Sequence, residues 1–284
     1  MPAHAARVVI EARRGWVSLE LAELWSYRDL VALLALRDLR ARYKQSALGV
    51  AWALIQPLGT LLAFSGLFTL LLGRGRMPGV AGVPYELSTL CALVPWQLFA
   101  GALVASGNSL VQNQALITKV YFPRLVAPLA PILVACVDCA LALALLLAVL
   151  FFTGFTPGLS ALWLPAFALL AVLAALGVSL WLAALNALYR DVRHALPFLA
   201  QLWMLATPVV YASERVLAGR PEWLAWLYGA NPMAAVVEGF RFALLGTPPP
   251  PAPLLFASSA SVALLLVGGA YFFRSLEESF ADRV

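Results

Sequence analysis

The stretch ALALALLLAVLFF, residues 140–152, contains only apolar residues. It ends a longer run, residues 126–152, in which Asp138 is the one charged residue. An α-helix needs about 20 apolar residues to cross the roughly 30 Å hydrocarbon core of a bilayer. A strand of a transmembrane β-barrel would instead alternate apolar and polar residues over about ten positions. The stretch therefore predicts a membrane-spanning helix.

The rest of the chain repeats this pattern. Of its 284 residues, 63% are apolar and 12% are charged, against roughly 45–50% and 25% in soluble proteins. This composition excludes a water-soluble globular protein, so the predicted fold class is an all-α membrane protein with several spans. The apolar runs predict six transmembrane helices, at residues 49–72, 87–107, 126–152, 162–185, 195–211 and 254–273.

The region before the first span, residues 1–48, is charged and has no apolar run long enough to cross. Residues 1–23 also lack the apolar core of a cleavable signal peptide, so we expect the N-terminus to be retained. Residues 21–45 have apolar side chains at spacings of three and four with basic ones among them. This pattern predicts an amphipathic helix at the membrane surface that faces anionic headgroups. A solvated helix in a small soluble cap is the alternative.

The distribution of charge predicts the topology. Six crossings place both termini, including the tail at residues 274–284, on one side of the membrane. Fourteen of the 19 Lys and Arg residues then fall in the segments on that side, which the positive-inside rule identifies as the cytoplasm. The basic character of the chain therefore reflects its topology, and no nucleic-acid partner is expected.

The segment between the fifth and sixth spans, residues 212–253, is too long for a turn and too apolar for a solvated loop. Asn231 and Pro232 form a good helix start, and an apolar face continues to residue 245. A helix of about 21 Å is too short to span, so we expect it to dip into the outer leaflet as a re-entrant or interfacial helix. Within it, Glu238 and Arg241 can face each other or water, and Gly246 ends it.

Groups for catalysis or metal binding are scarce. Cys91, Cys136 and Cys139 all lie in apolar runs, and we expect them to be small buried side chains rather than a redox or metal site. The one acidic residue deep in a span is Asp138. A structural hydrogen bond between helices, the lining of a polar conduit and proton coupling all stay open for it.

Aromatic side chains are the spans' most distinctive feature. Flat rings can stack on the apolar faces of sugars and still allow sliding, because the contact is non-directional. Each ring could equally be a core or interfacial residue. The candidates for a pathway lining are Trp52, Phe64, Phe68, Trp96, Phe99, Trp203 and Tyr211.

The sequence also lacks a phosphate-binding G-x-x-x-x-G-K-[ST] motif. If the protein transports against a gradient, a separate partner must supply the energy. No internal repeat relates the first three spans to the last three, which argues against the inverted repeats of many secondary transporters. Because six helices enclose little space, we expect a homodimer.

Several short motifs, in a fixed order from about residue 20 onward, together resemble the permease subunits of polysaccharide ABC exporters, the Wzm-like O-antigen and TagG-like teichoic-acid permeases. The motifs are Arg42-Tyr43-Lys44, Leu48-Gly49, Gln56-Pro57, Pro84-Tyr85, the run from Leu116 to Arg124, Tyr189-Arg190-Asp191-Val192-Arg193, Pro208-Val209-Val210-Tyr211, Asn231-Pro232-Met233, Phe240-Arg241 and Leu244-Leu245-Gly246.

This resemblance implies a permease of the bacterial inner membrane with six spans per subunit and no catalytic site of its own. It implies a homodimer that forms a sugar-chain channel, and two cytoplasmic ATPase subunits that bind the ATP and Mg²⁺. It also implies that a polyprenyl-diphosphate-linked polysaccharide enters from the membrane lipid near Arg42, Lys44, Leu48 and Gly49. The outer gate would contain Asn231, Pro232, Phe240 and Arg241.

The loop at residues 108–124 suits docking into an ATPase. It offers apolar knobs and basic charges, although an ordinary basic loop would look similar. The knobs are Val111, Leu116, Ile117 and Tyr121, and the charges are Lys119 and Arg124.

Export of a lipid-linked polysaccharide, O-antigen in the first place, is the function that the sequence favours. Export of capsule or teichoic acid is an alternative, as is a small-molecule or drug export permease. A membrane enzyme or scaffold that binds polyprenyl lipids is disfavoured by the scarcity of catalytic groups.

Overall fold

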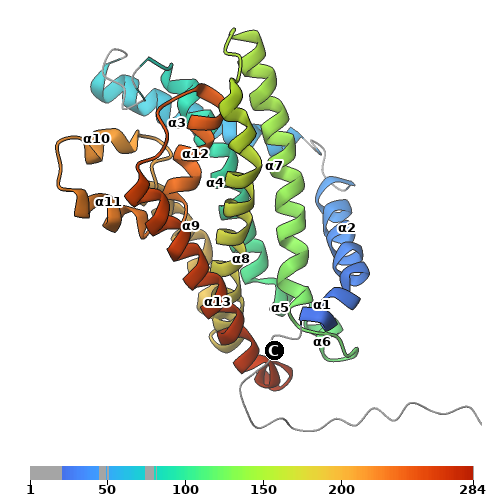
Figure 1. Ribbon diagram of the computed structural model, residues 1–284. Coiled ribbons are helices and arrows are strands. Elements are labelled where there is room, and N and C mark those ends of the chain that lie inside the picture. Colours follow the sequence, from blue (N-terminus) through green and yellow to red (C-terminus); the bar gives the residue numbers. More distant parts are fainter. Residues whose placement is uncertain (1–20, 45–48, 50, 74–79, 81, 284) are drawn as a thin grey trace, which may run out of the picture.

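The computed structural model describes residues 21–44, 49, 51–73, 80 and 82–283, and every element in them is a helix (Figure 1). The predicted all-α class is confirmed. The helices are α1 (Leu21–Ser26), α2 (Arg28–Lys44), α3 (Ala51–Leu72), α4 (Tyr85–Gly107), α5 (Ser109–Gln112), α6 (Gln114–Ile117), α7 (Val126–Phe152), η2 (Leu159–Trp163), α8 (Leu164–Leu188), α9 (Val192–Ala206), α10 (Ser213–Leu217), α11 (Glu222–Gly229), α12 (Ala234–Leu245) and α13 (Ala252–Arg283).

Five helical segments of the described chain are long and apolar enough to cross a membrane: α3, α4, α7, η2 with α8, and α13. The predicted fifth span, residues 195–211, corresponds to α9, which has 15 residues and a length of about 22 Å. Residues 207–212 continue from it without helical structure. The count of six crossings therefore stays a prediction.

Helix α4 lies at the centre and packs against α7, α8 and α12. The most extensive pairing is between α8 and α13, where glycines let the two backbones approach closely. A Cβ at Gly177 would lie 2.8 Å from the Leu266 nitrogen, and one at Gly269 would lie 2.7 Å from the Gly177 carbonyl oxygen. Small residues serve this purpose in membrane helix pairs, because van der Waals packing drives their association.

Two ends of the bundle are distinct in Figure 1. Helices α1, α5, α6 and the C-terminal end of α13 gather at one end, which we call the loop end. Helices α3 and η2 lie toward the opposite end, where α3 runs across the bundle rather than along it. The described parts of both termini therefore share the end that carries loop 108–124, as the predicted topology requires.

Helix α13 is longer than the predicted sixth span. It continues through residues 274–283, which we had predicted as a tail. Phe273 and Phe280, seven positions apart on one face, are fully buried and contact each other edge-on. This apolar face continues the helix past the membrane-spanning segment and packs it at the loop end, in a cluster with Ile117 and Phe122.

Helix α12 is the short helix that we expected after Asn231. It begins at Ala234 rather than Pro232, and it ends before Gly246, which has a positive φ of 66° as a helix-terminating glycine does. Rather than lying at a surface, it is buried against α4 and α8. At Gly239 a Cβ would lie 2.2 Å from the ring of Phe167, so only glycine fits there.

Candidate functional site

Arg241 of α12 has a side chain that is 1% exposed. Its guanidinium donates to the carbonyl oxygens of Ser88 at 3.2 Å, Val209 at 2.8 Å and Tyr211 at 3.3 Å. It also pairs with Glu238 at 3.1 Å. The predicted pairing of Glu238 with Arg241 is confirmed, and the alternative that Arg241 faces water is wrong.

These contacts compensate for the short α9. The backbone at residues 207–212 is not helical. In hydrocarbon, each backbone N–H or C=O group without a hydrogen-bond partner costs roughly several kcal/mol. Arg241 supplies donors to two of its carbonyls, and the carboxylate of Glu238 accepts the Ser213 N–H at 2.9 Å. Helix α12 therefore fastens the segment that follows α9.

Asn231 joins the same two elements. Its Oδ1 accepts the indole N–H of Trp203 at 3.1 Å and the backbone N–H of Met233 at 3.0 Å, while its Nδ2 donates to Thr207 at 2.8 Å. The predicted helix start at Asn231 and Pro232 is wrong by two residues, because the helix is capped at Met233; Asn231 instead closes the turn that precedes it. We call Asn231, Glu238, Phe240 and Arg241 the gate cluster; the outer-gate role predicted for Asn231, Phe240, Arg241 and the buried Pro232 stays a prediction.

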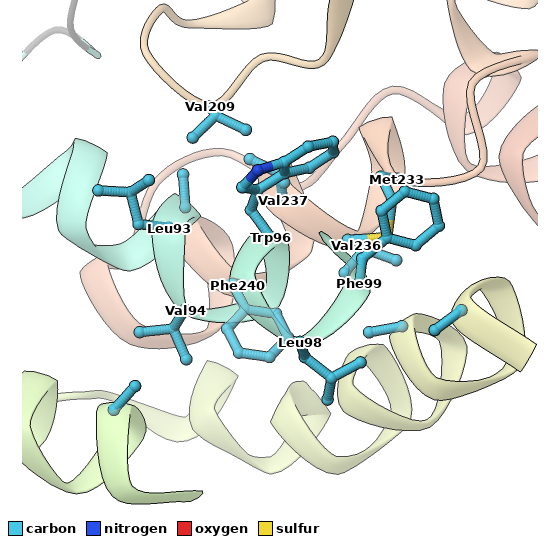
Figure 2. Close-up of a cluster of buried hydrophobic side chains, with 14 of the residues drawn as sticks. Leu93, Val94, Trp96, Leu98, Phe99, Val209, Met233, Val236, Val237 and Phe240 are labelled. Carbon is cyan, nitrogen blue, oxygen red and sulfur yellow. The ribbon is translucent and has the colours of Figure 1, made fainter. Parts of the chain in front are cut away.

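The apolar part of this region is a tightly packed core. Figure 2 shows Trp96 and Phe99 of α4 beside Val236 and Val237 of α12 and Met233, which directly precedes that helix, with Phe240 below them. Phe240 and Phe99 are fully buried. The predicted gate residues are therefore built into the bundle rather than displayed on its surface.

The candidate lining residues form two aromatic groups. The ring of Phe99 lies 5.4 Å from Trp96 and, edge-on, 5.2 Å from Trp203. The ring of Phe68 stacks on Phe64 at 6.3 Å and meets Tyr85 edge-on at 5.9 Å.

These rings differ in how much surface they present. Phe99 and Trp96 are buried, Phe64, Phe68 and Trp203 are half-buried, and Trp52 is exposed. The hydroxyl of the half-buried Tyr211 lies 2.7 Å from that of Tyr228. The lining role of all seven rings stays a prediction, and in the single chain Trp96 and Phe99 act in packing.

Helix α2 packs along α7 and reaches Asp138, near the middle of that helix (Figure 1). Arg42 donates to one carboxylate oxygen of Asp138 and the Tyr43 hydroxyl donates to the other. Burial and this hydrogen bond raise the pKa of Tyr43 to about 12, so its hydroxyl stays protonated at physiological pH. Asp138 therefore has an interhelical structural contact, while a conduit or proton-coupling role stays untested.

Sequence reasoning could not find these partners. Arg42 lies 96 residues before Asp138, and it belongs to a helix that we expected to lie at the membrane surface. Of the other residues predicted near substrate access, Lys44 is exposed in the last turn of α2 and Gly49 has a φ of 48°. Leu48 lies outside the described residues.

Loop 108–124, which we call the coupling loop, contains α5 and α6. Asn113 accepts a hydrogen bond from Arg37 of α2 at 2.9 Å, and the backbone N–H of Arg124 donates to Glu277 of α13 at 2.9 Å. The loop is thereby tied to two neighbouring helices.

Its side chains divide into an anchored set and an exposed tip. Lys119, Val120 and Tyr121 are exposed, and Tyr121 is 81% exposed. Val111, Leu116 and Arg124 are half-buried. Ile117 is only 8% exposed, so its prediction as a docking knob is wrong because it packs inward. Val120 is a further exposed apolar side chain of the tip that we did not predict as a docking residue. Its place between Lys119 and Tyr121 in the sequence could have indicated it.

The chain is similar to known transport proteins over most of its length. Residues 29–245 match the family model described as ABC-2 type transporter. Two O-antigen export system permease proteins RfbA of Klebsiella pneumoniae are each 31% identical over 214 residues, which is 75% of this chain and 79% of theirs. The O-antigen export system permease protein RfbA of Myxococcus xanthus is 28% identical over 219 residues, 77% of this chain and 81% of its own. The chain therefore belongs to the ABC-2 type transporter family.

Proposed function

We propose that the protein is the transmembrane subunit of an ABC exporter that moves a lipid-linked polysaccharide, O-antigen in the first place, across the bacterial inner membrane. The observation that carries this proposal is the similarity to O-antigen permeases over three quarters of both chains. Two copies would form the channel, and two ATPase subunits would bind ATP and Mg²⁺.

The exposed tip of the coupling loop supports the ATPase partner. Lys119, Val120 and Tyr121 combine a cation with two apolar side chains on a loop whose base is fastened. Such a tip can enter a cleft without refolding, and aromatic side chains are common anchors at interfaces.

The aromatic side chains support a sugar substrate. A polymer must slide past the same place many times, so weak, non-directional contacts with rings suit it better than tight polar binding. We assign this lining to Trp52, Phe64, Phe68, Trp203 and Tyr211, each of which keeps exposed surface in the single chain.

Deletion of the gene in its native host tests the function. Lipid-linked polysaccharide should accumulate on the inner face, and surface polysaccharide should disappear from antibody staining and from gels of extracted lipopolysaccharide. The wild-type gene should restore display. Unchanged lipopolysaccharide together with new sensitivity to a small toxic compound would instead indicate drug export, and loss of capsule or teichoic acid alone would reassign the polymer.

Single cysteines in a cysteine-free background test the orientation. Lys119 and Glu214 are exposed, so a cysteine at either position can react with a maleimide. An impermeant maleimide should label Glu214→Cys in intact cells and label Lys119→Cys only after the inner membrane is opened. Labelling of both in intact cells would refute the six-span topology.

A further inference from the structure

Helix α2 is held by polar contacts at two levels. Near its middle, Arg37 donates to Asn113 of the coupling loop at 2.9 Å. In its last turn, Arg42 and Tyr43 donate to the two carboxylate oxygens of Asp138. The first contact joins α2 to the loop end, and the second joins it to the interior of the third predicted span.

Among the described contacts, the two hydrogen bonds to Asp138 fix the last turn of α2. The buried apolar residues of α2, Val31, Leu34 and Ala35, all lie in its first half. Residues 40–42 and 44 are exposed, and Tyr43 is half-buried. Apolar packing therefore holds α2 as far as Leu39, whereas the carboxylate of Asp138 holds the last turn.

Helix α2 is also suited to transmit a displacement. Residues 28–44 form one continuous helix that contains neither proline nor glycine, the usual sites of kinks. Arg37 and Tyr43 lie six residues apart, which is about 9 Å along the helix axis. A movement of Asn113 would therefore reach the last turn with little loss.

The charge of Asp138 makes its contact specific. An unpaired carboxylate near the middle of a span is costly, so Asp138 favours conformations in which Arg42 stays close. The side chains of Arg42 and Asp138 are 47% and 24% exposed, so the pair is not locked inside the core. A charged pair at the edge of the bundle can therefore stay in contact while α2 and α7 move.

We propose that Asp138 is a positioning residue for export: by holding Arg42 and Tyr43, it makes α2 and α7 move together when the coupling loop is displaced. This inference rests on the proposed function for the meaning of the coupling loop. The link between α2 and α7 can be measured without substrate, so the two ideas can fail separately.

The experiment uses the full complex with its ATPase partner in lipid nanodiscs. Spin labels at Ala41 in α2 and Leu147 in α7, both exposed, report their separation by pulsed electron paramagnetic resonance. The wild-type complex should give the same narrow distance distribution without nucleotide and with ATP trapped, because the contact holds in both states. Asp138→Asn should give a broad distribution in both states.

The functional readout is the ratio of export to ATP hydrolysis. We expect Asp138→Asn to lower export about fivefold, the effect of losing a half-exposed ion pair, while ATP hydrolysis stays near wild type. Arg40→Gln is the matched control, because it removes a positive charge from the same turn and leaves both hydrogen bonds to Asp138 in place. It should leave the distance and the ratio unchanged.

A charge swap, Arg42→Asp with Asp138→Arg, separates positioning from folding. It should restore both the narrow distribution and the export ratio that Asp138→Asn loses. A narrow distribution and a normal ratio in Asp138→Asn would overturn the proposal. A well-folded swap variant that keeps the broad distribution would also overturn it, and this decides the matter if Asp138→Asn alone accumulates poorly. If the wild-type complex keeps the narrow distribution in both nucleotide states but exports another compound, the proposed substrate fails and the positioning role stands.

Discussion

Arg241 and Arg42 each pair with a carboxylate, but their surroundings are opposite. Arg241 is 1% exposed, its carboxylate is three residues away on the same helix, and three backbone carbonyls complete its contacts. Arg42 is 47% exposed, and its partner Asp138 is 96 residues away on another helix. One pair lies inside the bundle and the other lies at its edge.

The difference separates framework from adjustable contact. A buried arginine with every neighbour satisfied fixes the backbone around it, because moving it would leave several polar groups unpaired in a medium without water. A half-exposed pair that is held by side chains alone can rearrange while the backbone around it stays hydrogen-bonded. We therefore expect the gate cluster to determine folding, and the contact between α2 and Asp138 to determine how the folded protein works.

The largest expected effect is that of Arg241→Leu. It leaves the carboxylate of Glu238 buried without its partner and the carbonyls of Ser88, Val209 and Tyr211 without their donor. Breaking a buried pair in this way typically costs about 3–5 kcal/mol. The variant should fail to accumulate in membranes or should unfold at much lower temperature in detergent, measured by the loss of the monodisperse peak in size-exclusion chromatography.

Arg241→Lys is the matched control, because an ammonium keeps the charge but cannot donate from one planar group to several acceptors at once. It should have intermediate stability. Wild-type abundance and melting temperature in Arg241→Leu would contradict the assignment of Arg241 to the framework.

The second expected effect is that of Asn231→Ala. It removes the acceptor of the Trp203 indole N–H and the donor to Thr207, and each buried polar group left without a partner costs about 1–3 kcal/mol. Trp203→Phe, which removes only the indole donor, should cost less. If both variants melt at the wild-type temperature, Asn231 does not hold α9 to α12.

The same contrast explains what could be predicted from the sequence. The bounds of α7 were predicted exactly as found, 126–152, because a long apolar run limits a spanning helix by itself. The pairing of Glu238 with Arg241 was predicted because three residues along a helix bring side chains together. Both are local consequences of the sequence.

The contacts that sequence reasoning missed are non-local. The partners of Asp138 lie on a helix almost a hundred residues earlier, and no spacing rule relates them. The inward position of Ile117 depends on Phe122, Phe273 and Phe280, which come together only in the folded bundle. The short length of α9 was likewise hidden, because Arg241 completes a segment that hydropathy alone reads as one span.

A third prediction concerns Arg42→Gln. Arg42→Gln leaves the Tyr43 hydroxyl as a donor to the Asp138 carboxylate, so we expect a loss of stability of about 1–3 kcal/mol, below the loss in Arg241→Leu. Export should nevertheless fall, because the last turn of α2 loses its charged contact. Melting temperature and surface polysaccharide measured on the same preparations check this, and a stability loss as large as that of Arg241→Leu would erase the distinction between the two arginines.

The smallest expected effect on stability is that of Tyr121→Ala, at the exposed tip of the coupling loop. Because the side chain is 81% exposed, its removal should change the free energy of unfolding by less than about 0.5 kcal/mol. Ile117→Ala, four residues away but buried, should destabilise the protein by about 2–5 kcal/mol, because it creates a cavity in the cluster at the loop end.

The order of the two variants is reversed for binding of the ATPase subunit. Tyr121→Ala should weaken co-purification of that subunit more than Ile117→Ala does, since truncating a central aromatic anchor typically costs about 2 kcal/mol or more. Co-purification at the wild-type level in Tyr121→Ala, with normal export, would place the docking surface elsewhere on the loop end and leave Lys119 and Val120 as the next residues to change.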